Sequence, residues 1–123
     1  HDIHDQFGGT VADKLLAHIG EVTRSSLREN DVLIRFDGEE FLIVMPETEI
    51  NGARFVVDRL QLILQKTPMI HNGQRLSSPF SAGITQFITG ERAEDLIERA
   101  RHTLHAAKTV GHGSVRIAEP AAQ

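Results

Sequence analysis

Apolar residues recur along the chain at two spacings, which separate helices from strands. Steps of three or four residues, as at Val11, Leu15, Ile19 and Val22, predict a helix because they place apolar side chains on one stripe. Short apolar runs beside Asp-Gly or Asn-Gly predict hairpins, because glycine accepts the positive φ of a tight turn. We therefore expect helices at 10–28, 49–67 and 93–110, and strands at 32–36, 41–45, 69–71, 74–76, 80–87 and 115–117.

Two local signals refine this pattern. Thr10, followed by Asp13 three residues later, is typical of a capping box and predicts that the first of these helices starts there. Gly83, inside an otherwise apolar strand, predicts a close approach of another backbone, because a glycine leaves room that a side chain would fill.

The order of these elements predicts the fold class. Helices that alternate with strands and hairpins favour an α+β fold, with a mostly antiparallel central sheet flanked by helices. A length of 123 residues with 40% apolar residues suits one domain with one core. We place that domain at 1–117 and a tail at 118–123. The chain begins at His1 without an initiator methionine, so we expect a fragment of a longer protein.

Composition and charge exclude several classes of function. The chain has no cysteine, which removes disulfides, thiolate metal sites and cysteine nucleophiles. Its formal net charge of −4 and the absence of a basic run argue against polymeric nucleic acid as a partner. No apolar run approaches the roughly 20 residues that a membrane span needs. The seven histidines include no motif such as His-Glu-x-x-His. Carboxylates, His, Ser and Lys remain as candidate catalytic groups.

The predicted hairpin at 35–41 carries three acids, Asp37, Glu39 and Glu40, around Gly38. Like charges this close repel one another unless a cation lies among them, and hard divalent ions bind carboxylate oxygens together with substrate phosphates. The pattern therefore suits a site for a metal ion and a nucleotide. These residues taken alone favour the alternative, a solvated acidic turn, since most Asp-Gly hairpins bind nothing.

The segment Arg-Phe-Asp-Gly-Glu-Glu-Phe at 35–41 resembles the signature of the GGDEF family of diguanylate cyclase domains, Arg-Tyr-Gly-Gly-(Asp/Glu)-Glu-Phe. The resemblance implies a nucleotidyl-cyclase, palm-like fold whose first strand lies upstream of Ile3. It also implies condensation of two GTP into cyclic di-GMP with release of pyrophosphate, and a homodimer with one GTP in each subunit. Glu39 would bind Mg²⁺ or Mn²⁺, Glu40 would accompany it as a catalytic residue, and Gly38 would lie near the nucleotide.

Further family motifs occur in order along the chain. The segment from His1 to Leu16 resembles the motif that holds the guanine base, and it implies base contacts for His4 and Asp13. A carboxylate suits this role because it accepts from both N1–H and the 2-amino group of guanine. Asp13 is alternatively a first-turn acid that stabilises its helix.

The segment from Ala100 to Gly113 resembles the family's final-helix motif. The resemblance implies that Lys108 contacts the terminal phosphates as a catalytic and substrate-binding residue, with His112 in the place of a family arginine. Lys108 is alternatively a last-turn cation that interacts with the helix dipole.

The string Arg28-Glu29-Asn30-Asp31 resembles the family's inhibitory Arg-x-x-Asp motif. With Arg59, the resemblance implies a product-feedback site for cyclic di-GMP. Guanidinium groups suit such a ligand because they form paired hydrogen bonds with guanine and phosphate. The alternative is an ordinary exposed ion pair.

Four departures from the family motifs, at His4, Asp37, His105 and His112, predict weaker activity or none. The first hypothesis is a cytoplasmic diguanylate cyclase domain, fused to a sensory, membrane or other signalling domain outside this segment. The second is a degenerate domain that acts as a receptor for cyclic di-GMP or GTP. The third is a dimerisation module that binds no nucleotide.

Overall fold

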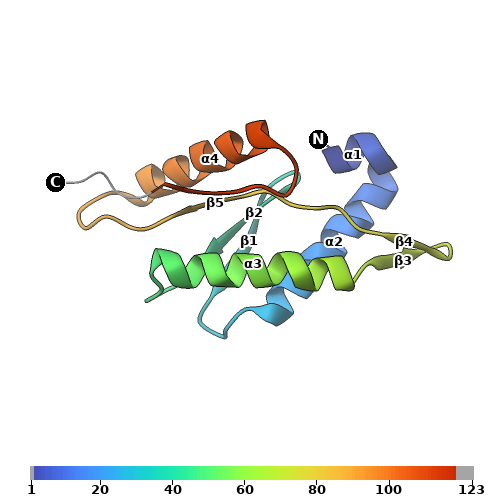
Figure 1. The fold of residues 1–123 in the computed structure, drawn as a ribbon, viewed down its shortest axis with the longest axis horizontal. Helices are drawn as coiled ribbons and strands as arrows, with labels where there is room; N and C mark the ends of the chain where they lie inside the picture. The colour runs from blue at the N-terminus through green and yellow to red at the C-terminus, as the bar shows by residue number, and fades with distance from the viewer. Residues whose placement is uncertain (1, 119–123) are drawn as a thin grey trace. The chain divides into compact units, whose positions relative to one another are not determined.

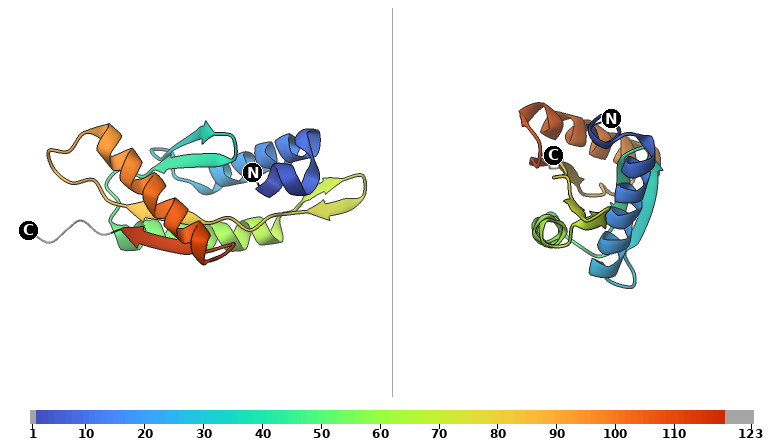
Figure 2. Two further views of the ribbon diagram at one scale, coloured as in Figure 1. Left: turned by 90° about the horizontal axis from the view of Figure 1, so that it is seen from above. Right: turned by 90° about the vertical axis from the view of Figure 1, so that its right-hand side faces the viewer.

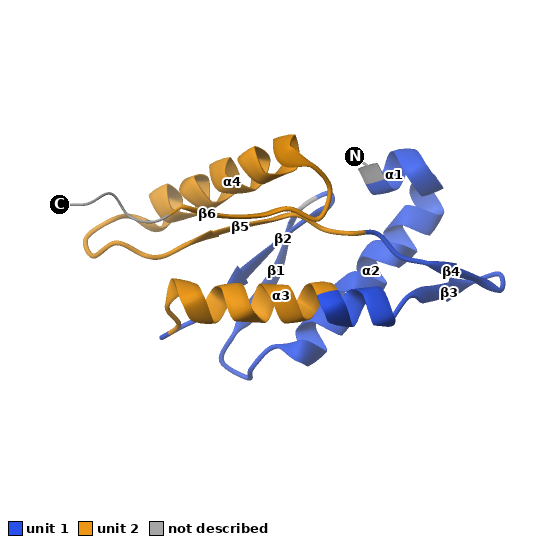
Figure 3. Ribbon diagram, in the orientation of Figure 1, with its two compact units in different colours: residues 1–47, 62–78 blue, residues 48–61, 79–123 orange. Residues whose placement is uncertain are grey.

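The computed structural model describes residues 2–118 and confirms the α+β class (Figure 1). The elements are α1 (Asp2–Phe7), α2 (Gly9–Ser26), β1 (Val32–Asp37), β2 (Glu40–Val44), α3 (Ile50–Lys66), β3 (Met69–His71), β4 (Gln74–Leu76), β5 (Ala82–Thr85), α4 (Ala93–Val110) and β6 (Val115–Ala118). They fall into two compact units, unit 1 at residues 1–47 and 62–78 and unit 2 at 48–61 and 79–123 (Figure 3). None of the helices within 2–118 has the length and apolar character that crossing a bilayer requires.

The described strands form three two-stranded sheets, where the sequence predicts one central sheet. The pairs β1–β2 and β3–β4 are antiparallel, and β5–β6 is parallel. Tight turns join the two antiparallel pairs, whereas the parallel pair needs a longer crossover, which α4 provides. Turn residues specify that two consecutive strands form a hairpin. They do not specify which further strands add to that hairpin to make a larger sheet.

Most of the predicted bounds agree with the structure, and the largest differences are at α2 and at β5, which is two residues shorter at each end than the predicted strand. The predicted ranges of β3, β4 and α4 match the observed ones, and Asn72 and Gly73 form the β3–β4 turn with φ of 49° and 78°. The capping-box prediction is wrong, because α2 starts at Gly9 and its N-cap is Gly8, with no side-chain cap. The separate short helix α1 is not predicted. β6 extends through Ala118, and the rest of the predicted tail, 119–123, lies outside the described residues.

In unit 1, α2 carries the most buried side chains and the β1–β2 hairpin lies beside it (Figure 2). Leu15 and Leu16 are each 1% exposed, which is expected for the apolar stripe of an amphipathic helix. Gly20 on α2 faces the ring of Phe41 on β2, so closely that a Cβ at position 20 would lie 3.2 Å from Phe41 Cε1. The Phe41 ring of the signature thus packs against α2 and fixes the hairpin there.

In unit 2, β5 packs closely against α4. A Cβ built on Gly83 would lie 2.3 Å from the Leu104 amide nitrogen and 2.8 Å from the Ala100 carbonyl oxygen. Real Cβ atoms do not approach backbone this closely, so only glycine allows β5 and α4 to lie at this separation. The predicted close approach at Gly83 is confirmed.

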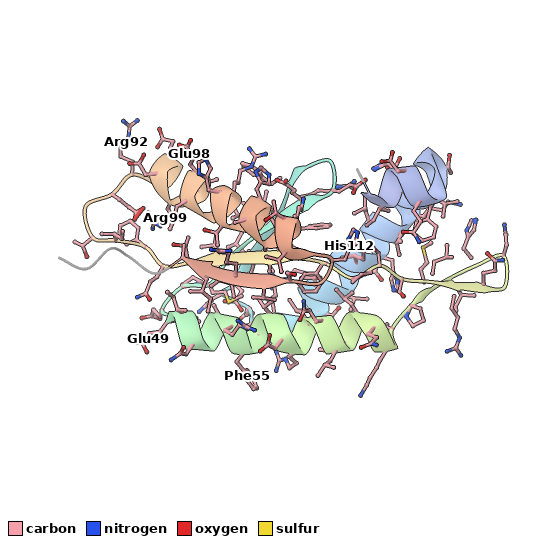
Figure 4. All side chains as sticks on the ribbon, turned by 45° about the horizontal axis from the view of Figure 1, so that its top comes forward. Glu49, Phe55, Arg92, Glu98, Arg99 and His112 are labelled. Carbon is pink, nitrogen blue, oxygen red and sulfur yellow. The ribbon has the colours of Figure 1, made fainter. Side chains whose placement is uncertain are left out.

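A hydrogen-bond network around Arg99, the α4 residue labelled in Figure 4, ties α4 to the segment that precedes it. Arg99 donates from Nη1 and Nη2 to the two carboxylate oxygens of Glu91, each at 2.9 Å, and from Nε to the Thr85 hydroxyl at 2.7 Å. The Ile88 amide also donates to Glu91. The Arg99 side chain is the largest cause of the lowered pKa of Glu91, so this carboxylate stays ionised into acid.

We expect Gly83→Ala to lower the free energy of unfolding by about 1–3 kcal/mol, the usual effect of overpacking. The added methyl group would force β5 away from α4. Urea denaturation measures the change. Gly9→Ala is the control, because a Cβ there meets nothing within 4 Å and position 9 is helical. Equal stability of Gly83→Ala and the parent protein would contradict the close packing.

We expect Glu91→Gln to lower the melting temperature at pH 7 and to make it less sensitive to acid. Because the pKa of Glu91 is lower in the folded protein than its ordinary 4.5, its stabilisation is present above that value. The stabilisation is lost as the pH falls through the folded pKa, so the two melting temperatures should converge in acid. Glu94→Gln is the control, since the Glu94 ion pair with Arg92 is exposed. A constant difference between pH 7 and pH 3 would contradict this account.

Candidate functional site

The β1–β2 turn places Glu39 at its second position. Gly38 takes a positive φ of 29°, and Arg35 donates to the Gly38 carbonyl from Nε at 3.0 Å and from Nη2 at 2.8 Å. Sequence reasoning did not assign this role to Arg35, although the residue belongs to the signature. Asp37 pairs with Glu40 across the turn, and the Asp37 side chain is outside the described part of the structure.

The Glu39 carboxylate is 13% exposed and accepts hydrogen bonds from Ile3 and His4, which lie in the described part of α1. The Ile3 amide donates to Oε1 at 3.2 Å and the His4 amide to Oε2 at 2.9 Å. The His4 ring contacts Oε2 through Nδ1 at 2.5 Å. Burial by itself raises the pKa of Glu39, whereas the hydrogen bonds from His4 and Ile3 are among the interactions that favour the charged form and lower the pKa. Glu39 is therefore ionised near neutral pH.

The His4 ring also contacts Asp13, from Nε2 to Oδ1 at 3.1 Å. Its hydrogen bonds with Glu39 first, and then with Asp13, raise the pKa of His4. An imidazole between two carboxylates favours its protonated form, in which both ring nitrogens donate. The structure thus brings three sequence-predicted residues, His4, Asp13 and Glu39, into one hydrogen-bonded cluster.

The side chains of His4, Asp13 and Glu39 determine whether a divalent metal ion can bind at this cluster. Among the residues that the structure describes, no three His, Asp or Glu side chains are arranged to hold a metal ion. Mg²⁺, however, is usually bound by one or two carboxylates together with substrate phosphates and waters. Glu39 offers one ionised carboxylate of this kind, so its chemistry fits an ion shared with a nucleotide. Glu40, the first residue of β2, lies next to it.

The Arg-x-x-Asp motif forms a tight loop after α2. The Asp31 side chain is only 2% exposed, and it accepts from the Arg28 amide at 2.9 Å and from Arg28 Nη2 at 3.1 Å. The Arg28 side chain is the largest cause of the lowered pKa of Asp31. Arg24 adds a bond from Nη1 to the Asp31 carbonyl at 2.7 Å. Asp31 is therefore a buried acceptor within its own loop, whereas the Arg28 side chain is 62% exposed.

A surface hollow of about 280 Å³ lies beside this motif in unit 1. Five residues from the loops after α2 and β2 line it: Arg28, Glu29, Asn30, Pro46 and Glu47. Arg28 spans the two loops, because its Nη2 also donates to the Pro46 carbonyl at 3.3 Å. The lining of the hollow thus includes one cationic residue, Arg28, and two acidic residues, Glu29 and Glu47.

The other predicted site residues belong to unit 2. Lys108 is exposed in the last turn of α4. His112, labelled in Figure 4, is exposed just after that helix. Arg59 lies on α3 with its Cζ 6.0 Å from the centre of the Phe55 ring, within reach of a cation–π contact. Arg59 therefore belongs to unit 2, whereas Arg28 and Asp31 belong to unit 1.

Comparison with known proteins agrees with this architecture. The family model "Diguanylate cyclase, GGDEF domain" matches residues 1–114. Diguanylate cyclase DgcP of Pseudomonas aeruginosa is 37% identical over 116 residues, which are 94% of this chain and 17% of DgcP. Cyclic di-GMP phosphodiesterase NbdA of the same species is 32% identical over 115 residues, which are 93% of this chain and 15% of NbdA.

A solved structure shares the fold along nearly the whole chain. Diguanylate cyclase SiaD from Pseudomonas aeruginosa, solved in complex with its activator SiaC, matches with a TM-score of 0.83 and 27% identity. The match covers 95% of this chain and 45% of SiaD. The chain thus spans less than a fifth of both curated relatives, DgcP and NbdA. From the matched model, the sequence identity and the shared fold, the chain belongs to the GGDEF family of diguanylate cyclase domains.

Proposed function

We propose that this domain condenses two molecules of GTP into cyclic di-GMP and releases pyrophosphate. The observation that carries the proposal is the position of Glu39, which is ionised at the signature turn and lies in the same cluster of side chains as Asp13. The group proposed for the metal ion and the groups proposed for the base therefore lie side by side. Membership of the GGDEF family supports the same activity.

Each residue has a distinct task in this proposal. Asp13 accepts hydrogen bonds from the guanine base, with His4 beside it. Gly38 leaves the turn open to the nucleotide, since a Cβ at that position would meet nothing within 4 Å. A magnesium or manganese ion held by Glu39, with Glu40 beside it, would offset negative charge on the phosphate oxygens.

Lys108 and His112 contact the terminal phosphates of GTP in this proposal. Both are exposed at the end of α4 and thus accessible to a ligand. His112 carries only part of a positive charge near neutral pH, so it binds phosphate more weakly than an arginine would. Each subunit holds one GTP, so catalysis requires a homodimer.

Regulation and location complete the proposal. Product feedback acts through Arg28, Asp31 and Arg59, and the hollow beside Arg28 supports a ligand there. The domain works in the cytoplasm as part of a longer signalling protein. The small share of DgcP and NbdA that the chain matches, 17% and 15%, supports a longer protein.

A second function is favoured by one specific observation. The His4 ring already contacts the Glu39 oxygen that a metal ion would use. If this contact persists with GTP bound, the domain is a receptor for cyclic di-GMP or GTP and not a cyclase.

The test is an assay of the full-length protein with GTP and Mg²⁺, in which chromatography follows cyclic di-GMP and pyrophosphate. We expect product, and a loss of roughly a hundredfold or more in Glu39→Ala, since that change removes a group facing developing phosphate charge. Glu21→Gln, on an exposed part of α2, is the control and should retain activity. If no product forms while calorimetry shows cyclic di-GMP binding that Arg28→Ala abolishes, the receptor function is correct.

We expect His4→Asn to raise the rate roughly threefold to tenfold, the equivalent of about one hydrogen bond. An amide offers a donor and an acceptor side by side to the guanine base, and it carries no charge to compete with a metal ion for Glu39. Initial rates across a series of Mg²⁺ concentrations measure the change, and the gain should be largest at low Mg²⁺. An unchanged or lower rate at every concentration would show that His4 does not oppose catalysis.

A further inference from the structure

The short loop at 111–114, between α4 and β6, contains His112, one of the two residues proposed to contact the terminal phosphates of GTP. Glycines flank this histidine on both sides, and both take a positive φ, 151° at Gly111 and 76° at Gly113. Because glycine adopts many backbone conformations, local preference alone does not fix a residue between two of them. Contacts from outside the loop must therefore hold His112. The inference that follows rests on the proposed phosphate contacts and identifies one such contact.

Gln61 on α3 binds this loop, although it lies 52 residues before Gly113 in the sequence. Its side-chain nitrogen Nε2 donates to the Gly113 carbonyl at 3.0 Å and to the Phe80 carbonyl at 3.2 Å. An amide NH₂ group has two hydrogens, so one side chain can form both bonds at once. The three residues all belong to unit 2 (Figure 3). Gln61 thus ties the residue after His112 to α3 and to the segment before β5.

Other hydrogen bonds hold the two ends of the same loop. The Ser81 hydroxyl donates to the Gly111 carbonyl at 3.3 Å, and the Ala82 amide donates to the Ser114 carbonyl at 2.9 Å. The first bond holds the loop where it leaves α4, and the second holds it where it enters β6. The bond from Gln61 acts between these two points. Without it, we expect the middle of the loop to move while its ends stay in place.

The position of Gln61 on α3 does not by itself call for a polar side chain. Gln61 is half-buried and follows Leu60, which is 2% exposed. An apolar side chain of similar length would suit such a position in the packing. It would, however, leave the Phe80 and Gly113 carbonyls without the donor that Gln61 provides. The amide therefore serves the loop, and packing alone does not require it.

Lys108, the other residue proposed for the terminal phosphates, depends on the loop much less. It lies in the last turn of α4, so the helix determines the position of its backbone. A change in the middle of the loop should therefore alter the contribution of His112 to phosphate binding and leave that of Lys108 in place.

We propose that Gln61 is a positioning residue for the recognition of the terminal phosphates of GTP. Its bond to the Gly113 carbonyl holds His112 where the imidazole meets the phosphate. Gln61 does not touch the nucleotide, and its effect passes through the backbone of the loop.

The test is isothermal titration calorimetry of the full-length protein with Mg²⁺ and two ligands. One is the α,β-methylene analogue of GTP, in which a carbon replaces the oxygen of the bond that the proposed reaction breaks. The other is GMP, which lacks the terminal phosphates. Gln61→Met keeps the length of the side chain and removes the donor. We expect it to weaken binding of the GTP analogue by roughly threefold to tenfold, the equivalent of about one hydrogen bond, and to leave GMP binding unchanged.

Double variants separate positioning from a general loss of structure. His112→Ala should weaken binding of the GTP analogue in the parent protein and add little in Gln61→Met, because both changes remove the same contribution. Lys108→Ala should weaken binding by the same factor in both backgrounds. Gln65→Met, at an exposed position of α3, is the matched control and should keep both affinities.

Two sets of results would overturn the role of Gln61. The first is an unchanged affinity of Gln61→Met for the GTP analogue, or independent losses in Gln61→Met and His112→Ala. The second is a loss of GMP binding, or of the Lys108 contribution, in Gln61→Met, which would indicate a general structural role. If the parent protein binds the GTP analogue no more tightly than GMP, or if His112→Ala binds it as tightly as the parent does, the proposed phosphate contact is itself wrong.

Discussion

The Glu39 carboxylate and its hydrogen bonds are the interaction on which the arrangement of the candidate site depends. They join the start of the chain to a turn 35 residues further along, because the amide and the ring of His4 both contact Oε2. A carboxylate that accepts from two amides and an imidazole remains charged, and it fixes the orientation of each donor. The same bonds determine where His4 can meet Asp13. These bonds thus add a direct link between α1 and the signature turn to the packing of Phe41 against α2.

Arginines repeatedly fix loops through backbone carbonyls in this chain. Arg35 closes the signature turn through the Gly38 carbonyl, and Arg24 holds the loop after α2 through the Arg28 and Asp31 carbonyls. Arg99 does the same for the segment before α4, through the Gln86 carbonyl. The planar guanidinium offers five donors, so one side chain can satisfy several acceptors that a loop leaves unpaired. A loop held in this way keeps its shape without regular secondary structure, which a binding loop needs.

Local signals predicted the fold well where a few neighbouring residues decide the structure. The Asn72-Gly73 turn, the α4 bounds and the close packing at Gly83 all follow from backbone freedom or from side-chain periodicity. The prediction at Thr10 failed because Gly8, with φ of 83°, ends α1 and caps α2 in the place of a hydroxyl. Such a two-helix junction leaves almost no periodic pattern, since α1 has only six residues.

The candidate site was predictable in its residue types and not in its contacts. The motifs named His4, Asp13 and Glu39, yet the bond between His4 and Glu39 joins residues that no local pattern relates. Burial of Asp31 was equally hidden, because the same Arg-x-x-Asp string is common on exposed surfaces. Residue spacing reports which groups can meet along one element. It does not report which groups are already satisfied by a partner elsewhere in the chain.

The histidine at position 4 also changes the charge balance of the site before any ligand binds. With the asparagine of the family motif, Glu39 and Asp13 would be two carboxylates without a cation between them, and a bound metal ion would relieve their repulsion. A protonated His4 supplies that positive charge from within the protein, and it does so through a direct contact with each carboxylate. In the proposed cyclase, a metal ion at Glu39 would have to displace or deprotonate the imidazole, so part of the affinity for the ion would be lost to this competition. The substitution would then stabilise the empty site at the expense of the proposed metal-bound one. A receptor tolerates this shift, whereas a cyclase must overcome it with the affinity of GTP itself.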